Sequence, residues 1–196
     1  VIANQEENTA RVVGRLADRG VDVWVSYPRS VREGAELLRE LAQLGASPER
    51  VARVVDPVFA ALAQAEARQH EARAAGRVGP RVFCAIWRDP WMTVGGDTYI
   101  HDLIELCGGA NVFAKGAEGR RYPIVERAAI EAAAPELILL PSEPYRFGEV
   151  DRRELLELDC PAAASDRVYL IDGTLVSWYG PRIAEAIRVL GRLLAI

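Results

Sequence analysis

The sequence predicts an α/β protein in which two parallel-sheet lobes are joined by one long connector helix, with the first lobe incomplete. Two observations lead to this fold class. Short apolar segments alternate with helical patterns along the chain, which is typical of parallel sheets covered by helices. One predicted helix, opening near Ser47, is too long for an ordinary crossover, and a second series of strands and helices follows it. We therefore expect the remainder of an N-terminal lobe at residues 1–46, the connector at 47–76 and a C-terminal lobe at 77–196.

Composition limits the class of protein. With 196 residues, 50% of them hydrophobic, the chain can bury a substantial core. A formal net charge of −4 gives no electrostatic support for a nucleic-acid partner. No apolar run approaches the roughly 20 residues of a membrane span. Residues 1–7 form neither a signal peptide nor a start at methionine, so we expect a processed or trimmed chain whose beginning does not argue for the cytosol.

The order strand, helix, strand, helix in residues 1–46 indicates a parallel layer. A capping box of Ser30 and Glu33, whose side chains can bind free N–H groups of the first turn, marks the start of the second helix. The expected elements are a strand at residues 1–3, a helix at 9–19, a strand at 21–25 and a helix from Ser30 to Gly45.

The connector helix has a strong start signal. Ser47 is a suitable N-cap, and Pro48 fits the first turn. Pro57 marks either a kink or a second start, and no later Gly or Pro interrupts the helix before Gly76. Its first half carries an apolar stripe, whereas beyond Ala65 it is polar and alanine-rich. This pattern favours a connector between two lobes over the alternative, an oversized crossover helix.

A second α/β unit follows the connector. We expect strands at residues 81–87, 137–140 and 168–171, and helices beginning near Thr98, Val125, Glu149 and Pro181. In open parallel sheets, ligands bind beyond the carboxyl ends of the strands. The segments that follow the strands are therefore the places where a binding site is expected.

Aromatic side chains gather in those segments. Aromatic residues form only 7% of the chain, so their concentration at one predicted sheet edge needs a cause. Beside arginines, such rings suit a large, flat ligand that is partly anionic or rimmed with amides. The alternative is that the rings cap the sheet edge and pack the loops on one another. The residues are Tyr27, Trp91, Tyr145, Phe147, Trp178 and Tyr179, with Trp87 at a strand end, Tyr122 in a further loop, and Arg88, Arg146 and Arg182 beside them.

The sequence gives thin support for catalysis. His70 and His101 are the only histidines, and Ser, Cys and His form no nucleophile arrangement. An enzyme that uses Glu143 or Asp172 as a general base stays open as a hypothesis. A zinc or manganese site is disfavoured, because such sites need several converging His and carboxylate ligands. The turn at residues 95–98 reads as a helix cap rather than an anion site.

Three cysteines, Cys84, Cys107 and Cys160, show neither a paired motif nor metal-ligand spacing. Cys84 lies in an apolar strand-like run and is expected in the core. The set fits a reducing compartment, or one disulfide with a leftover thiol.

Two segments of the second unit carry a family resemblance. Residues 81–100 read RVFCAIWRDPWMTVGGDTYI, and residues 106–113 read LCGGANVF. They resemble the start of the C-terminal lobe in cobalamin-binding proteins of the helical-backbone metal receptor class. The resemblance continues in order through Tyr122-Pro123, PELILLP at 135–141 and WYGPR at 178–182, while residues 1–4 and 20–23 fit the second half of the first lobe.

The resemblance implies a class III solute-binding protein, with two α/β lobes joined by one long rigid helix. Such a protein is not an enzyme and has no intrinsic cofactor; it holds a ligand such as cobalamin, haem or a ferric siderophore in the inter-lobe cleft. It delivers the ligand to the permease of an ABC importer, which docks through acidic residues on both lobes. We accordingly expect a periplasmic or otherwise extracytoplasmic monomer. A cytosolic ligand-binding or sensing protein on the same scaffold is the alternative.

Position in the resemblance assigns several roles. Asn4 falls where cobalamin-binding members place a first-lobe aromatic, Trp91 and Tyr122 fall at second-lobe pocket aromatics, and the loop ending at Trp178 closes the cleft. The expected ligand-binding residues are Asn4, Trp87, Arg88, Trp91, Tyr122, Tyr145, Trp178 and Tyr179. The expected docking residues are Glu6 and Glu7 on lobe one and Glu143 and Glu149 on lobe two.

Three departures from the family pattern matter. Asn4 removes one of the stacking faces that the cobalamin-binding members have. Relatives can tie the cysteine of the Cys-Gly-Gly turn to the C-terminal helix, but here that helix offers Leu190 and Gly191, so Cys107 lacks this partner. The opening segment of the family, roughly 50 residues of lobe one, is absent, so we expect the complete protein to be longer.

Overall fold

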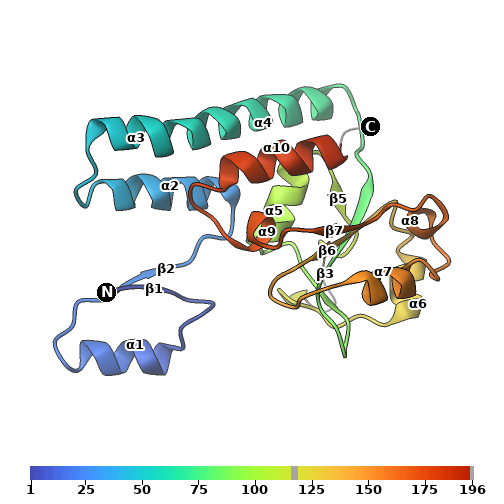
Figure 1. The fold of residues 1–196 in the computed structure, drawn as a ribbon, viewed down its shortest axis with the longest axis horizontal. Helices are drawn as coiled ribbons and strands as arrows, with labels where there is room; N and C mark the ends of the chain where they lie inside the picture. Colours follow the sequence, from blue (N-terminus) through green and yellow to red (C-terminus); the bar gives the residue numbers. More distant parts are fainter. Residues whose placement is uncertain (116–118, 195–196) are drawn as a thin grey trace.

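The computed structural model describes residues 1–115 and 119–194, which form two separate sheets (Figure 1). A two-stranded parallel sheet pairs β1 (Ile2–Asn4) with β2 (Trp24–Ser26). A five-stranded sheet has the order β4-β3-β6-β7, with β5 pairing β3. Its strands are β3 (Arg81–Trp87), β4 (Met92–Thr93), β5 (Ala110–Asn111), β6 (Leu137–Pro141) and β7 (Val168–Ile171). The predicted α/β class with parallel pairing is confirmed.

The small sheet and its crossover helix lie apart from the larger sheet (Figure 1). The crossover is α1 (Ala10–Ala17), which Thr9 caps by accepting a hydrogen bond from the N–H of Val12. No residue of α1 is fully buried, and Ile2 and Trp24 on the strands are 53% and 37% exposed. Few buried contacts therefore hold this part of the chain.

Helix α2 (Val31–Ala42) begins at the predicted cap. The Ser30 side chain accepts from the N–H of Glu33 at 3.1 Å, while the Glu33 carboxylate accepts from the N–H of Arg29 at 2.6 Å. Val31 and Ala35 are fully buried in the core shared with the larger sheet. The boundary predicted at residue 46 takes no account of this packing. Periodicity shows that a helix has an apolar face, but it does not show which element covers that face.

The predicted connector forms two helices in line, α3 (Pro48–Val54) and α4 (Asp56–Ala74) (Figure 1). The start at Ser47 is confirmed, since its side chain accepts from the N–H of Arg50 at 3.3 Å. Of the two alternatives at Pro57, a kink or a second start, the structure has the second: the helix breaks at Val55, and Pro57, which has no N–H to donate, lies in the first turn of α4.

The two helices lie above α2 and above α10 (Ile183–Leu194), which α4 contacts along much of its length (Figure 1). The buried residues of α4 are Val58, Leu62 and Ala65. The apolar stripe in the first half of α4 therefore packs on its neighbours, and the polar end also contacts the larger lobe, since the Gln69 side chain donates to the backbone oxygen of Glu105 at 2.8 Å. The boundaries given to the connector, residues 47–76, stay a prediction.

The larger sheet is buried on both faces, as the alternation of its side chains shows. In β6, Leu137 and Leu139 join the core beneath α4, whereas Ile138 and Leu140 join the core on the opposite face. The first core is covered by α5 (Tyr99–Leu106), α9 (Thr174–Ser177) and α10. The second lies beneath α6 (Arg127–Ala132), α7 (Glu149–Leu155) and α8 (Pro161–Ala164).

The strands predicted at 81–87, 137–140 and 168–171 are confirmed. The helix predicted near Val125 begins at Arg127, and the one predicted near Pro181 begins at Ile183. Elements too short to show a period, namely β4, β5, α8 and α9, were not predicted.

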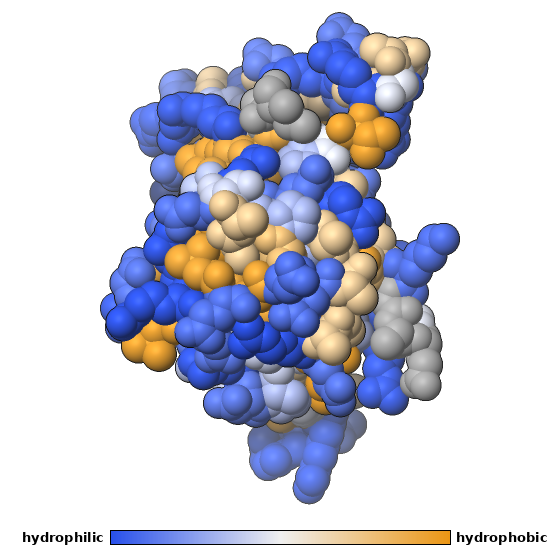
Figure 2. Space-filling model, turned by 90° about the vertical axis from the view of Figure 1, so that its right-hand side faces the viewer, coloured by the Kyte–Doolittle hydropathy of each residue, from blue (hydrophilic) through white to orange (hydrophobic). Residues whose placement is uncertain are grey.

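The surface of this lobe mixes apolar and hydrophilic areas. On the side that faces right in Figure 1, apolar patches are interrupted by hydrophilic residues (Figure 2).

Within the described ranges, no helix combines the length and the apolar character needed to cross a membrane.

Candidate ligand-binding site

Three loops leave the carboxyl ends of β3, β6 and β7, at the sheet edge where a ligand site is expected. Aromatic rings from the end of β3 and from two of these loops contact one another in series. The ring of Trp87 lies 5.7 Å from that of Tyr145, which lies 4.7 Å from that of Phe147. Phe147 in turn stacks on Trp91, with centroids 5.9 Å apart and planes at 4°. We call Trp87, Trp91, Tyr145 and Phe147 the aromatic cluster.

Burial differs within the aromatic cluster. Phe147 is 5% exposed and belongs to a hydrophobic core, whereas Trp87 is 43% exposed. Trp91 and Tyr145 are partly buried against the same core. The inner rings therefore hold the loops on the sheet edge, and Trp87 presents open ring surface.

Trp178, directly after the short helix α9 that follows β7, is the most exposed of the predicted aromatics. It is 58% exposed, and its indole N–H donates to the Glu143 carboxylate at 2.5 Å. The loops after β6 and β7 approach so closely that a Cβ on Gly173 would lie 2.3 Å from the Glu143 nitrogen. Only glycine fits there, and its N–H donates to the Ser142 hydroxyl at 3.0 Å. Glu143 thus orients Trp178 beside the loop that carries Tyr145.

Arg88 is engaged by α7. Its guanidinium pairs with both Asp151 and Glu154, and it lies 5.7 Å from the centre of the Trp91 ring. The hydrogen bond to Asp151 raises the pKa of Arg88 above its ordinary value. Asp151 is nearly buried and also accepts from the N–H of Gly148 at 2.7 Å. Arg88 therefore ties the loop after β3 to α7, and its contact with a ligand at the cleft rim stays a prediction.

A second group of side chains joins the small sheet to the larger lobe. The Glu6 carboxylate, from the segment after β1, accepts from Arg121 at 2.8 Å and also from the Tyr122 hydroxyl. The Arg121 guanidinium carbon lies 4.8 Å from the centre of the Tyr27 ring and 5.3 Å from that of Tyr122. We call Glu6, Tyr27, Arg121 and Tyr122 the inter-lobe cluster. Burial, followed by the hydrogen bond to Glu6, raises the pKa of Tyr122 well above its ordinary value.

Arg121 is fixed from its own lobe. Its Nε donates to the backbone oxygen of Asp97 at 2.6 Å, and the Asp97 carboxylate lies 3.3 Å from Arg29. The segment that carries Arg121 packs closely against Gly95. A Cβ at Gly95 would lie 2.5 Å from the Arg120 oxygen, so the close approach requires glycine. Thr98 caps α5, as the turn at 95–98 predicts. Nη2 of Arg121 is buried and has no hydrogen-bond partner in the described part of the chain, an omission that typically costs about 1–3 kcal/mol.

No family model matches the chain. Among curated proteins, a vitamin B12-binding protein of Salmonella choleraesuis is 30% identical over 141 residues, covering 71% of this chain and 50% of that protein. A vitamin B12-binding protein of Yersinia pestis is 27% identical over 168 residues, covering 84% of this chain and 56% of that protein. The chain thus spans about half the length of the curated relatives it matches.

Solved structures agree in fold. The periplasmic heme-binding protein RhuT from Roseiflexus sp. RS-1 superposes with a TM-score of 0.77 at 22% identity, over 98% of this chain and 74% of that one. The periplasmic vitamin B12-binding protein BtuF of Vibrio cholerae gives 0.77 at 19%, over 98% of this chain and 72% of that one. The chain has the class III periplasmic binding-protein fold and is a sequence relative of vitamin B12-binding proteins. The predicted fold and resemblance are therefore confirmed.

Within this fold, the predicted ligand residues fall into three places. Trp87, Trp91 and Tyr145 meet in the aromatic cluster, and Trp178 reaches the same loop through Glu143. Tyr122 lies in the inter-lobe cluster. Elsewhere, the Asn4 side chain accepts from the N–H of Glu6 at 2.7 Å, and Tyr179 packs edge-on against Tyr99 at 5.6 Å. The contact of all these residues with a ligand stays a prediction.

Sequence reasoning missed Arg121. The segment that carries it shows neither strand nor helix periodicity, so nothing local indicates where its side chain lies. The signal that could have found it is the pair Arg120-Arg121 directly before the predicted pocket residue Tyr122. The contact with Tyr27 could not be seen, because it joins the two lobes.

The four acidic residues expected at the lobe tips differ in accessibility. Glu6, Glu7 and Glu149 are exposed, and Glu143 is partly buried. Glu6 and Glu143 are not free tips, because Glu6 is bound to Arg121 and Tyr122 and Glu143 is bound to Trp178. Glu149 lies 3.9 Å from Arg152, and docking of these four residues to a permease stays a prediction.

The carboxylates considered as general bases are engaged in hydrogen bonds. Asp172 accepts from the N–H and hydroxyl of Thr174, at 2.9 and 2.7 Å, and these bonds lower its pKa. A lowered pKa makes a carboxylate a weaker base.

Across residues 1–115 and 119–194, no group of three or more His, Cys, Asp or Glu side chains is placed to hold a metal ion.

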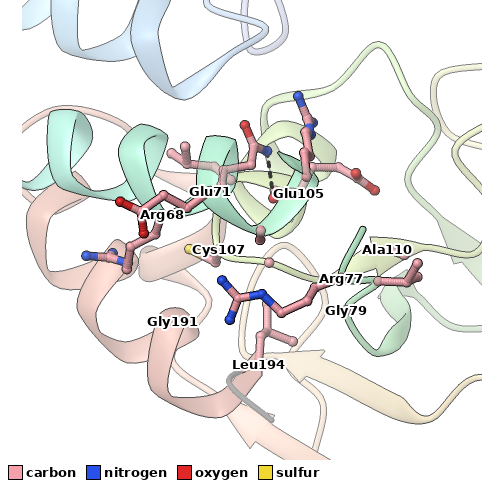
Figure 3. Close-up of a pocket in the computed structure, with 16 residues that line it drawn as sticks. Arg68, Glu71, Arg77, Gly79, Glu105, Cys107, Ala110, Gly191 and Leu194 are labelled. Carbon is pink, nitrogen blue, oxygen red and sulfur yellow. Dashed lines mark hydrogen bonds between the residues drawn. The ribbon is translucent and has the colours of Figure 1, made fainter. Parts of the chain in front are cut away.

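A cavity of about 900 Å³ lies away from both clusters, at the amino ends of β3 and β5. The ends of α4, α5 and α10 surround it, and the guanidinium of Arg77 points into it beside Cys107 (Figure 3). Burial raises the pKa of the Cys107 thiol to about 12, so the thiol stays protonated at neutral pH. Cys84, Cys107 and Cys160 are all free thiols.

Proposed function

We propose that the chain is the larger part of a protein that captures a large planar ligand between two lobes and delivers it to the permease of an ABC importer. The ligand class is a corrinoid or an iron chelate such as haem or a ferric siderophore. The observation that carries the proposal is the pair of exposed indoles, Trp87 at 43% and Trp178 at 58%, at the carboxyl edge of the larger sheet. The relatives named as vitamin B12-binding and heme-binding proteins support the same ligand class.

The two indoles suit stacking because their positions are restrained. Tyr145 packs against Trp87, and Glu143 binds the indole N–H of Trp178, so both rings are braced by the loop that carries Glu143 and Tyr145. A braced ring loses little conformational entropy when a ligand binds. Aromatic pairs of this kind add about 0.5–1.5 kcal/mol beyond the burial of area. Two such rings, with the rest of a cleft, support a binding protein that leaves its ligand unreacted.

Delivery requires a partner that recognises both lobes. Glu7, on the first, and Glu149, on the second, are exposed, and we assign both to contacts with basic groups of a permease. Charges at the rim of an interface mainly set the rate of encounter and the register. The proposal accordingly places the protein outside the cytoplasmic membrane.

The test is a titration of the complete protein with cobalamin, cobinamide, haem and ferric siderophores, followed by tryptophan fluorescence and checked by calorimetry. We expect saturable binding of at least one ligand, weakened about tenfold in Trp178→Ala and in Trp87→Ala, since each loses roughly 1.4 kcal/mol of stacking. Trp24→Phe, on the small sheet, is the matched control and should bind normally. Absence of binding to every ligand would refute the proposal.

A further inference from the structure

The carboxylate of Glu6 occupies the strongest anion-binding position of the inter-lobe cluster. It comes from the first lobe, yet both of its hydrogen-bond donors, Arg121 and Tyr122, belong to the second. Side chains of Glu6 and Arg121 are 30% and 23% exposed, so water reaches the pair. A partly solvated ion pair exchanges readily for another of similar strength.

The donors of this position are incompletely used. Arg121 offers two terminal nitrogens, but Glu6 engages only Nη1 through one of its oxygens, and the buried Nη2 has no hydrogen-bond partner within the described ranges. A guanidinium fixed at Nε, as Arg121 is by Asp97, matches a carboxylate that accepts from both terminal nitrogens. The Tyr122 hydroxyl lies beside it as a further donor.

We propose that Arg121 and Tyr122 recognise a carboxylate of the ligand, and that Glu6 holds this position until the ligand displaces it. This inference rests on the proposed function and narrows its ligand class to chelates that carry free carboxylates. Glu6 then acts as an internal competitor: it latches the lobes together when no ligand is bound and releases the first lobe when a ligand carboxylate takes its donors.

The proposal separates two kinds of planar ligand. Haem carries two propionate carboxylates, whereas cobalamin is rimmed by amides and offers no free carboxylate to a guanidinium. The same chemistry is available from a carboxylate siderophore, which has no flat ring. Haem, its dimethyl ester and ferric citrate therefore distinguish the two sources, because the ester keeps the ring and loses the charge.

The experiment measures the affinity of the complete protein for these three probes in four forms: unchanged, Glu6→Gln, Arg121→Met and Arg32→Met. Haem with its free propionates should bind up to about fivefold more tightly to Glu6→Gln, since the Glu6 carboxylate no longer competes for Arg121 and Tyr122. Haem binding should weaken about 10- to 100-fold in Arg121→Met, the worth of a charged hydrogen bond. The dimethyl ester should respond to neither change. Arg32→Met, which removes an exposed cation paired with Glu66, is the matched control and should leave all affinities unchanged.

The outcomes separate this inference from the proposed function. Three outcomes would refute the carboxylate site while ligand capture stands. Haem and its ester could bind alike, Glu6→Gln could leave the affinity for haem unchanged or weaken it, or cobalamin alone could bind. If no probe and no cobalamin or siderophore binds, both proposals fail. The latch also has a readout without ligand: the shifts in unfolding midpoint of Glu6→Gln and Arg121→Met should be non-additive in the double variant, and strict additivity would contradict the contact.

Discussion

The aromatic cluster and the inter-lobe cluster lie in one molecule but are held by different forces. Phe147, at the centre of the aromatic cluster, is 5% exposed and packs into a hydrophobic core. The rings of the aromatic cluster therefore move only if that core rearranges. Glu6, in the inter-lobe cluster, is joined to Arg121 by an ion pair that solvent reaches. The difference suggests a division of roles, with a rigid platform for the ring system of a ligand and an exchangeable polar contact between the lobes.

The largest effect expected from this comparison is on Phe147. Phe147→Ala should lower the free energy of unfolding by about 3–5 kcal/mol, because it empties a well-packed position beneath Trp91. Denaturant unfolding measures the change, and Phe147→Leu is the conservative control, with a smaller loss. A loss below about 1 kcal/mol for the alanine variant would mean that the platform does not depend on this packing.

A smaller effect is expected at Arg88. Arg88→Met should cost about 1–3 kcal/mol, because Asp151, whose side chain is 7% exposed, would lose its cation. Arg182→Met is the matched control: Arg182 and its partner Asp172 are 49% and 51% exposed, so the loss there should stay within about 1 kcal/mol. Equal losses in the two variants would contradict the structural role of Arg88.

The inter-lobe cluster should contribute less still. Glu6→Gln is expected to change the free energy of unfolding by less than about 1 kcal/mol, since the pair is partly exposed. The effect should shrink further at high salt, as surface ion pairs do. Unfolding in low and high salt measures both quantities; a large, salt-independent loss would place Glu6 among the structural residues instead.

The smallest effect is a shift in the titration of one phenol. Burial comes first, then the hydrogen bond and charge of Glu6, in raising the pKa of Tyr122. Glu6→Gln removes the negative charge that opposes formation of the phenolate, so it should lower the pKa of Tyr122 toward its ordinary value. Ultraviolet titration of the variant against Tyr122→Phe isolates this phenol. No shift would show that the two side chains do not meet in solution.

Local sequence signals predicted much of the fold, for reasons visible in particular residues. Ser30, Ser47 and Thr98 cap helices because each side chain binds an N–H of its own first turn. The apolar run at residues 137–140 predicted a strand, and the structure shows that β6 is buried on both faces. The break at Val55 was open in the sequence, since Pro57 is compatible with either a kink or a new start.

The candidate site was predicted less completely. The rings of the aromatic cluster lie next to strand ends, so their neighbourhood follows from the rule for parallel sheets. Glu6 and Arg121 are far apart in the chain and carry no motif, and only the packing of the first lobe on the second brings them together. The partners of Arg88 on α7 were hidden for the same reason.

Oxidative footprinting of the tryptophans in the complete protein, with and without a saturating ligand, tests the central claim most directly. Trp87 and Trp178, at 43% and 58% exposed, should react in the free protein and become protected when the ligand binds. Trp24, 37% exposed on the small sheet, is the internal control and should react equally in both states. Unchanged oxidation of Trp87 and Trp178 at saturation, or protection confined to residues around the cavity at Arg77 and Cys107, would contradict a ligand site at the carboxyl ends of the strands.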